Sequence, residues 1–255
     1  MIDFPLIIIQ ARMSSTRLPG KVMMTIGGWR VIDLLIHRLK RTVGIGQIVV
    51  ATTDEKSDDV LCKHLDEMDV PYFRGSENDV LLRFAECAKL YTAKTIIRVT
   101  ADCPFVDPRI LDDLLKEFCS QDLDYACLSP NFAEGLDVEV MTVSALLLAD
   151  ALAEKRSERE HVTLYFYNHP EKFRIVTLGQ SEDHGRHRFT LDTIEDMRVL
   201  EAIACHFGAK CPEISSSQIL EFLNEHPDIA MINSHIIRNE GLAISLKNDW
   251  VNGDG

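Results

Sequence analysis

Short apolar runs alternate with amphipathic stretches along the first half of this chain. The runs at residues 6–9, 47–52 and 95–100 are four to six residues long and largely apolar, as expected of strands that are buried on both faces. The stretches that follow them predict helices over residues 31–39, 56–68, 78–90 and 108–119. This alternation predicts an α/β fold of three αβα layers, with helices on both faces of a Rossmann-like, mostly parallel sheet.

The second half of the chain is less regular. Strands are expected over residues 137–141, 173–178 and 188–191, and helices over residues 144–155, 160–167, 193–207 and 215–224. Thr193 and Asp196 stand at the spacing of a capping box that opens the third of these helices. We expect one nucleotidyltransferase-sized domain over residues 1–255, with a small excursion for dimerisation or sugar binding at about residues 130–180. The polar residues 248–255 are expected to fray.

The charge of the chain is acidic overall and unevenly distributed. The formal net charge is −13, which argues against a general nucleic-acid binder or a protein of anionic membrane surfaces. Residues 12–41, however, hold seven basic side chains and a single acid, Asp33. One cationic segment in an acidic protein indicates a local site for an anion.

Cysteine usage and hydropathy indicate where the protein works. The seven cysteines are irregularly spaced and form no CxxC pair, so we expect reduced thiols rather than a disulfide framework or a structural zinc site. The first residues form no basic n-region, and no apolar run reaches the ~18–20 residues that span a bilayer. These features predict a cytoplasmic protein with no membrane association.

The strongest functional signal is the loop after the first strand, residues 10–21 (QARMSSTRLPGK). It leaves the carboxyl end of a strand, where open α/β sheets bind ligands. Its arginines offer forked donors to phosphate oxygens, Lys21 a mobile charge, and its hydroxyl side chains short neutral donors. The Pro19-Gly20 turn can bring Lys21 back toward the arginines. The loop therefore suits a triphosphate, and the alternative is a solvated loop with ordinary surface cations.

The loop also carries a family resemblance. The pattern Arg12-x-x-Ser15-Thr16-Arg17-Leu18-Pro19-Gly20-Lys21 resembles the N-terminal signature of the sugar-acid cytidylyltransferases, which include the synthetases of CMP-3-deoxy-manno-octulosonate and CMP-sialic acid. The likeness is nearest to the spore coat polysaccharide biosynthesis branch. Weaker resemblances follow in the family's order at residues 73–83, 135–140, 158–163 and 188–192. The resemblance implies the fold of nucleotide-diphospho-sugar transferases.

The resemblance also implies residue roles, because in that family the first loop holds the triphosphate and two aspartates hold Mg²⁺. The phosphate role falls on Arg12, Ser15, Arg17 and Lys21. Further nucleotide contacts fall on three loop neighbours, Ala11, Ser14 and Thr16. The metal role falls on Asp102, which also contacts the nucleotide, and on Asp192.

The two aspartates also stand out without the resemblance. Asp102 and Asp192 follow the expected strands at residues 95–100 and 188–191, so both should reach the carboxyl edge of the sheet. Mg²⁺ prefers oxygen ligands and often takes one or two carboxylates together with substrate phosphates. The alternative for each aspartate is a turn or a helix cap.

Four more residues are candidates for nucleotide contacts. Thr52 and Asp54 follow the second strand, and the corresponding loop of the family lies near the nucleoside. Asp54 is equally well placed to cap a helix. Arg74 and Arg83 are candidates for contacts to the nucleotide or its base, although an arginine on a helix also forms surface ion pairs.

Candidates for the acceptor sugar lie in the second half of the chain. Asp137 and Glu139 alternate with apolar residues, so they should share one strand face, which is either solvent or a polar sugar site. Glu160 and His161 are expected to open a helix, where an acid also compensates the helix dipole. Residues 184–187 (HGRH) are expected to form an anion-facing or mobile loop, because they lack the further ligands of a zinc site.

Together these features predict a Mg²⁺-dependent cytidylyltransferase that transfers CMP from CTP to a sugar acid for surface polysaccharide biosynthesis and releases pyrophosphate. The expected catalytic residues are Arg12, Lys21, Asp102 and Asp192, and the family implies a homodimer. Three alternatives stay open. The enzyme could use another base or an alcohol or sugar-phosphate acceptor, it could be a glycosyltransferase with Asp122 and Asp124 as a DxD triplet, or it could bind nucleotides without catalysis.

Overall fold

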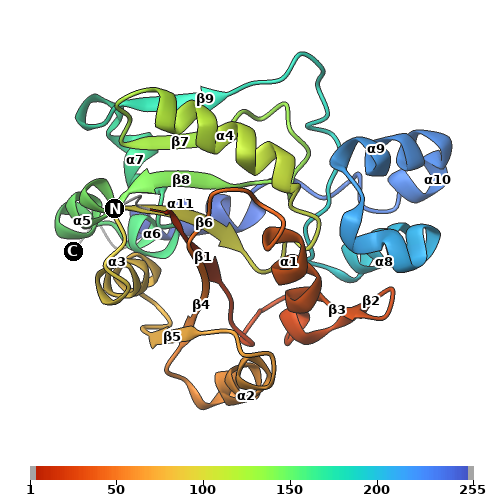
Figure 1. The fold of residues 1–255 in the computed structure, drawn as a ribbon, viewed down its shortest axis with the longest axis horizontal. Coiled ribbons are helices and arrows are strands. Elements are labelled where there is room, and N and C mark those ends of the chain that lie inside the picture. The colour runs from red at the N-terminus through yellow and green to blue at the C-terminus, as the bar shows by residue number, and fades with distance from the viewer. Residues whose placement is uncertain (1–3, 252–255) are drawn as a thin grey trace.

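The computed structural model describes residues 4–251, in which a seven-stranded sheet lies between layers of helices (Figure 1). The strands are β1 (Leu6–Gln10), β2 (Thr25–Ile26), β3 (Trp29–Arg30), β4 (Gln47–Thr53), β5 (Tyr72–Gly75), β6 (Thr95–Thr100), β7 (Tyr125–Leu128), β8 (Glu139–Thr142) and β9 (Ile175–Leu178). The order in the sheet is β5-β4-β1-β6-β8-β7-β9, and β8 runs antiparallel to both of its neighbours. Strands β2 and β3 form a separate antiparallel pair.

The alternation of side chains along β1 explains the two helical layers. Ile7 and Ile9 pack with the helices at residues 31–39, 59–67 and 108–120 on one face, whereas Leu6 and Ile8 pack with those at residues 80–90, 143–152 and 164–168 on the other. The helices are α1 (Val31–Leu39), α2 (Asp59–Glu67), α3 (Val80–Leu90), α4 (Pro108–Ser120), α5 (Val143–Leu152), α6 (Arg156–Glu160), α7 (Leu164–Asn168), α8 (Ile194–Phe207), α9 (Ser216–Glu225), α10 (Pro227–Ala230) and α11 (Glu240–Val251). The predicted three-layer, mostly parallel fold is confirmed.

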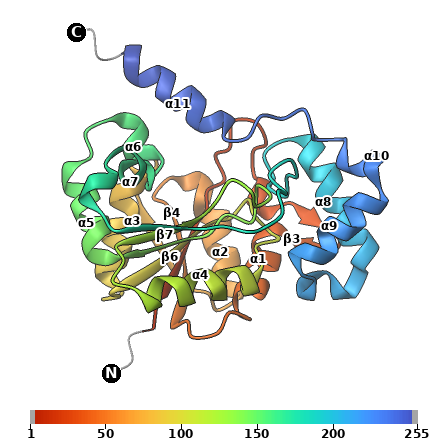
Figure 2. The same cartoon turned by 90° about the horizontal axis from the view of Figure 1, so that it is seen from above.

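A third cluster lies beside the sheet and supports the polypeptide that carries Asp192. Helices α8 and α9 pack around Phe189 and Leu191, together with Ile26 of β2 and Leu34 of α1. Figure 2 shows α8, α9 and α10 grouped at one side, while α11 crosses over the molecule from this group toward α6. No helix among residues 4–251 is long and apolar enough to cross a membrane.

The elements predicted for the first half lie close to their expected positions, whereas the short strands β2, β3, β5 and β7 were not predicted. The strand expected at residues 188–191 is wrong. That segment is extended and makes an isolated bridge between Glu134 and Arg188. Its backbone donates instead to loops, from Phe189 N to the Glu134 carbonyl (2.6 Å) and from Leu191 N to the Asp102 carbonyl (2.8 Å). The segment is therefore fixed against the end of β6 without joining the sheet.

Two other boundaries differ from the prediction. The helix expected at residues 160–167 begins only at Leu164, as α7, because α6 ends at Glu160 and Val162 has a φ of 36° in the turn between them. The strand expected from Asp137 begins at Glu139, since Asp137 accepts a hydrogen bond from Gly135 N in the preceding turn. Residues 248–251, where the sequence predicts fraying, continue α11, and residues 252–255 lie outside the described part of the chain. The single domain and its excursion at residues 130–180 stay predictions.

Candidate active site

Lys21, Asp102 and Asp192 converge at the carboxyl edge of the sheet. Lys21 Nζ lies 2.6 Å from Asp102 Oδ2 and 2.8 Å from Asp192 Oδ1. Asp102 follows β6, and Asp192 precedes the N-cap of α8. Gly20, with a φ of 72°, lets the chain reverse directly before Lys21. The turn predicted from the sequence thus delivers the ammonium to the two aspartates.

The charges of this trio support one another. Burial disfavours the ionised carboxyl group of Asp102, but the Lys21 ammonium outweighs burial and holds the pKa of Asp102 at about 2. Burial likewise opposes the charged form of Lys21, and the two carboxylates overcome it and raise the pKa of the lysine. Lys21 and Asp102 are therefore both ionised at neutral pH, and Lys21 acts as the counter-ion.

Two arginines also reach Asp192. Arg17 lies 3.1 Å from Asp192 Oδ2 and 2.6 Å from Glu240 at the start of α11. Arg188 donates to Asp192 (2.6 Å), to Asp196 (2.8 Å) and to Glu134. Asp196 also completes the predicted capping box with Thr193, which is confirmed. Asp192 is thus contacted by three cationic side chains, those of Arg17, Lys21 and Arg188.

The rest of the first loop lines the same edge. Arg12 lies 3.6 Å from Glu77, which also accepts a hydrogen bond from Ser14. Ser15 Oγ accepts from Leu18 N at 3.4 Å within the loop. Ala11 is buried beneath the loop, and Thr16 is exposed. The loop therefore presents its cations and hydroxyls at the sheet edge, and their contact with phosphates stays a prediction.

Asp102 and Asp192 are the residues that could hold a divalent cation. Their carboxylates already converge on one positive group at hydrogen-bonding distance. Two hard oxygen ligands, completed by substrate phosphates, make the donor set that Mg²⁺ commonly uses. Residues 4–251 contain no group of three or more His, Cys, Asp or Glu side chains arranged to hold a metal. The two carboxylates therefore fit a magnesium ion shared between protein and substrate.

Thr52 and Arg74 have structural partners at the end of β4. Thr52 is fully buried and donates to Asp58 Oδ2 at 2.7 Å. Arg74 donates to the carbonyls of Thr53 and Glu55, both at 2.8 Å, and lies 2.7 Å from Asp59. These contacts hold the β4–α2 connection in place, and direct contact of either residue with a nucleotide stays a prediction.

Asp54 and Asp58 show how the first loop is anchored. Asp54 is exposed, and the short 3-10 helix that precedes α2 begins after Glu55, so the interpretation of Asp54 as a helix cap is wrong. Asp58 instead accepts from Met13 N at 2.8 Å and from both hydroxyls of Thr52 and Thr53. It therefore ties the first loop to the end of β4.

Two of the three side-chain nitrogens of Arg83 have no hydrogen-bond acceptor within the described residues. Its side chain is fully buried, and Nη1 donates to the Ser76 carbonyl at 2.7 Å. Nε and Nη2 are buried with no hydrogen-bond partner within the described residues. Burial and the nearby Arg12 cation lower the pKa of Arg83 to about 10. Buried donors are nearly always satisfied in proteins, so the acceptors that Arg83 lacks could come from a ligand.

The candidate sugar residues are not gathered in one place. Glu139 is buried in the sheet and bonds Arg98 and Tyr125, whereas Asp137 is half exposed and lies 3.1 Å from Arg238. The expectation that both acids share an open strand face is wrong, because Asp137 precedes the strand. Glu160 and His161 end α6 instead of opening a helix, and both contact Ser245 of α11. Contact of these four residues with a sugar stays a prediction.

Comparison with known proteins identifies the family. The sequence profile of a cytidylyltransferase family matches residues 6–223. The chain belongs to this cytidylyltransferase family. The spore coat polysaccharide biosynthesis protein SpsF of Bacillus subtilis is 38% identical to this chain. The matched region covers 88% of this chain and 96% of SpsF.

Further cytidylyltransferases are similar in sequence and fold. The structure of a cytidylyltransferase from Leptospira borgpetersenii has a TM-score of 0.84 and 34% identity, covering 89% of this chain and 97% of its own. A 3-deoxy-manno-octulosonate cytidylyltransferase of Nitrobacter hamburgensis is 29% identical over 77% of this chain and 80% of its own. The resemblance recognised in the sequence is confirmed, and the protein is an enzyme of this family.

The candidate site includes residues for which the sequence analysis assigned no role. Arg188 and Glu134 form the wall next to Asp192. The position of Arg188 at the start of a largely apolar extended segment is the sequence signal that could have identified it. Glu240 lies far along the chain on α11, and no pattern in the sequence links it to Arg17.

The DxD triplet lies elsewhere. Asp122 and Asp124 precede β7 and pair with Arg174, which precedes β9. Both strands run parallel to β6 in direction, because β8 is antiparallel to β6 and to β7. The triplet therefore occupies the amino edge of the sheet, opposite Asp102, and has no access to the candidate site.

Proposed function

We propose that this chain transfers CMP from CTP to a hydroxyl group of a sugar acid, with Mg²⁺ as cofactor and pyrophosphate as the second product. The observation that carries the proposal is the convergence of Lys21, Asp102 and Asp192 beside a loop with two more arginines. The relatives support it, because one is named for spore coat polysaccharide biosynthesis and another for 3-deoxy-manno-octulosonate. Surface polysaccharide synthesis is accordingly the proposed role.

The chemistry follows from the charges. The hydroxyl oxygen of the acceptor bonds to the α-phosphorus of CTP and loses its proton to solvent, while the bond from that phosphorus to the β-phosphate breaks. Arg12, Arg17 and Lys21 hold the leaving pyrophosphate and stabilise the charge that develops on it. Asp102 and Asp192 would hold Mg²⁺, which when bound would neutralise charge on phosphate oxygens. Catalysis then consists of positioning and electrostatics, without a covalent enzyme intermediate.

Lys21 has two successive partners in this proposal. Its ammonium stands on a flexible four-carbon stem, so it can turn from the carboxylates to a phosphate oxygen when nucleotide fills the loop. The buried and unpaired donors of Arg83 support a nucleotide at this edge, because acceptor atoms of the ligand would satisfy them.

The test is pyrophosphate release from CTP, UTP, GTP or ATP with Mg²⁺ and a panel of sugar acids and sugar phosphates. The proposal requires release with CTP and a keto sugar acid. Release with another nucleotide or with sugar phosphates alone would replace it with the broader nucleotidyltransferase alternative. Nucleotide binding without release from any pair would point to a silent nucleotide-binding protein.

We also propose that the enzyme works in the cytosol as a homodimer. All seven cysteines lie in the described residues and are free thiols, which suits a reducing compartment. Light scattering on the purified protein tests the homodimer, and a monomeric mass would contradict it.

A further inference from the structure

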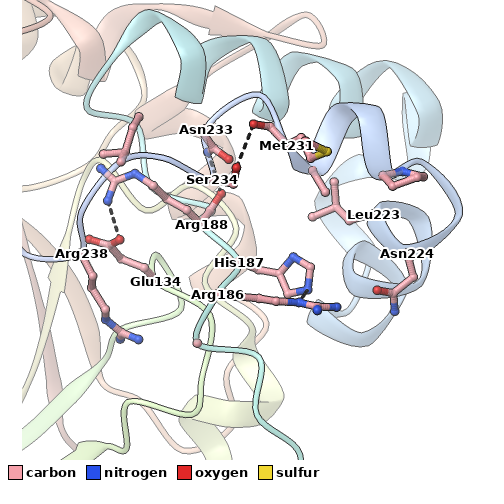
Figure 3. A pocket seen from close by; sticks show the side chains of 14 residues that line it. Glu134, Arg186, His187, Arg188, Leu223, Asn224, Met231, Asn233, Ser234 and Arg238 are labelled. Atoms are coloured by element: carbon pink, nitrogen blue, oxygen red, sulfur yellow. Dashed lines mark hydrogen bonds and ion pairs between the residues drawn. The ribbon is translucent and has the colours of Figure 1, made fainter.

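A pocket of about 480 Å³ opens beside the candidate active site (Figure 3). One wall is the polypeptide that leads to Asp192 and includes Arg186, His187 and Arg188. The opposite wall comes from α9, α10 and the segment after them, and includes Leu223 and Met231. The volume lies within the range of pockets that hold small organic ligands.

The pocket shares a side chain with the active site. Arg188 lines it and at the same time donates to Asp192 Oδ2 at 2.6 Å. A ligand in the pocket is therefore separated from an expected metal ligand by one guanidinium group. A second substrate that reacts with the α-phosphorus of a nucleotide bound at Asp192 could approach from the side of this pocket.

The lining is positively charged in an acidic protein. Its ionised side chains are three arginines and one glutamate, whereas the whole chain has a net charge of −13. Arg188 and Arg238 are engaged by carboxylates of the protein. Arg186 is exposed. Within residues 4–251 its side chain donates one hydrogen bond, from Nε to His187 Nε2 at 3.3 Å. Its terminal nitrogens are thus the donors available for a carboxylate, which arginine binds with a forked geometry.

The two walls match the two kinds of surface on a sugar. Figure 3 shows Arg186 and His187 on one side of the pocket and Leu223 and Met231 on the other. Sugar hydroxyl groups need hydrogen-bond partners, and the C–H face of the ring packs on apolar side chains. His187 is largely buried, and burial with the neighbouring Arg186 cation lowers its pKa. In the neutral imidazole, Nε2 accepts from Arg186, so Nδ1 carries the proton and can donate it to a hydroxyl group.

We propose that this pocket binds the acidic monosaccharide that accepts CMP, with the terminal nitrogens of Arg186 on its carboxylate. This assignment rests on the proposed function. The family profile ends at residue 223, so most of the apolar wall is formed by residues beyond it. The part of the chain that follows residue 223 then helps to select the acceptor.

The test separates the pocket from the catalytic reaction. Calorimetric titrations of 3-deoxy-manno-octulosonate, sialic acid and neutral glucose are made with the wild type and with Arg186→Gln, Met231→Trp and Arg198→Gln. Arg198 is exposed on α8 and is the matched control for loss of a positive charge. CTP affinity is measured for all four proteins as a check on the fold and the nucleotide site.

The expected result is binding of at least one sugar acid, but not of glucose, to the wild type. Arg186→Gln should weaken this binding by about tenfold or more, the usual effect of losing a hydrogen bond to a charged group. Met231→Trp should block binding by filling the pocket. Arg198→Gln should bind the sugar acid normally, and CTP affinity should be the same throughout.

The proposal is overturned if no sugar acid binds, or if Arg186→Gln and Met231→Trp bind it as the wild type does. Pyrophosphate assays then distinguish the two hypotheses. Turnover with an acceptor KM that neither substitution changes would leave the function standing and reject the pocket. Binding that depends on Arg186, without pyrophosphate release from CTP, would leave the pocket standing and reject the proposed reaction.

Discussion

Lys21 Nζ lies 2.6 Å from Asp102 Oδ2, so the residue expected to hold the leaving phosphates is the counter-ion of an expected metal ligand. The same ammonium lies 2.8 Å from Asp192. The charge of the carboxylate pair is therefore partly neutralised by the protein itself.

Lys21→Ala should lower kcat by ~10²-fold or more, because the reaction loses a donor to the developing charge. The measurement is pyrophosphate release at saturating CTP and acceptor. Lys116→Ala is the matched control, since Lys116 is exposed and pairs with Asp113 on α4. A kcat for Lys21→Ala equal to that of the control would remove Lys21 from the catalytic residues.

Gly135→Ala should destabilise the protein by at least ~2 kcal/mol. Gly135 has a φ of 94°, which is unfavourable for alanine, and an added Cβ would lie 2.4 Å from Thr190 N. The contact is with backbone of the segment that carries Asp192, so activity should fall as well. Gly179→Ala is the control, because nothing lies within 4 Å of its added Cβ. Urea unfolding of both variants measures the difference, and equal stabilities would contradict the argument.

Glu139→Ala should destabilise the protein by ~3–5 kcal/mol, since it leaves Arg98 charged and unpaired in the sheet. Asp113→Ala breaks an exposed pair and should cost less than ~1 kcal/mol. Denaturant unfolding supplies both values. Full stability of Glu139→Ala together with a raised acceptor KM would instead support the sugar-binding role predicted from the sequence.

Asp58→Asn should destabilise the protein in a pH-dependent way. Burial raises the pKa of Asp58, but hydrogen bonds from Thr53, Met13 and Thr52 outweigh it and lower the folded-state pKa. The unfolded chain therefore binds the proton more tightly, and the ionised carboxylate stabilises the fold above its unfolded pKa of about 3.9. The stabilisation is lost as the pH falls below that value. Unfolding free energies should differ by ~1–3 kcal/mol at neutral pH, and the gap should narrow in acid; a gap that widens would refute the assignment.

Glu240→Gln should lower the KM for CTP by roughly threefold at most, because it frees Arg17 from an exposed ion pair. The effect should shrink at high salt, which screens exposed charges. Glu171→Gln removes a similarly exposed charge beside His169 and serves as the control. A higher KM for Glu240→Gln would mean that the pair positions Arg17 for the nucleotide.

The sequence predicts the fold well where local patterns are strong. The apolar runs of β1, β4 and β6 and the amphipathic α1 and α4 carry their own periodicity. The short strands β5 and β7 have four residues each, too few for a pattern to emerge, and they form because neighbouring strands offer partners. The extended segment at residues 188–191 has strand-like composition, yet its hydrogen bonds go to loops.

The residues of the candidate site divide in the same way, into those that a local sequence pattern predicts and those that only tertiary contacts place. Lys21, Asp102 and Asp192 follow recognisable turns and strand ends, so their meeting at one edge could be anticipated. The partners of Asp58, Arg74 and Glu139 could not, because each depends on the register of strands or on a loop packed from elsewhere. Polar residues near a site look alike in sequence whether they bind a ligand or hold the scaffold.

Helix α11 lies beyond the residues matched by the family profile, yet it contacts both the first loop and two of the residues predicted to bind the sugar. Glu240 contacts Arg17, and Ser245 contacts Glu160 and His161 (Figure 2). Two descendants of one ancestral gene could therefore keep every recognisable motif and still diverge in how they handle substrates, through changes confined to this helix. Orthology inferred from the motifs alone would miss that divergence.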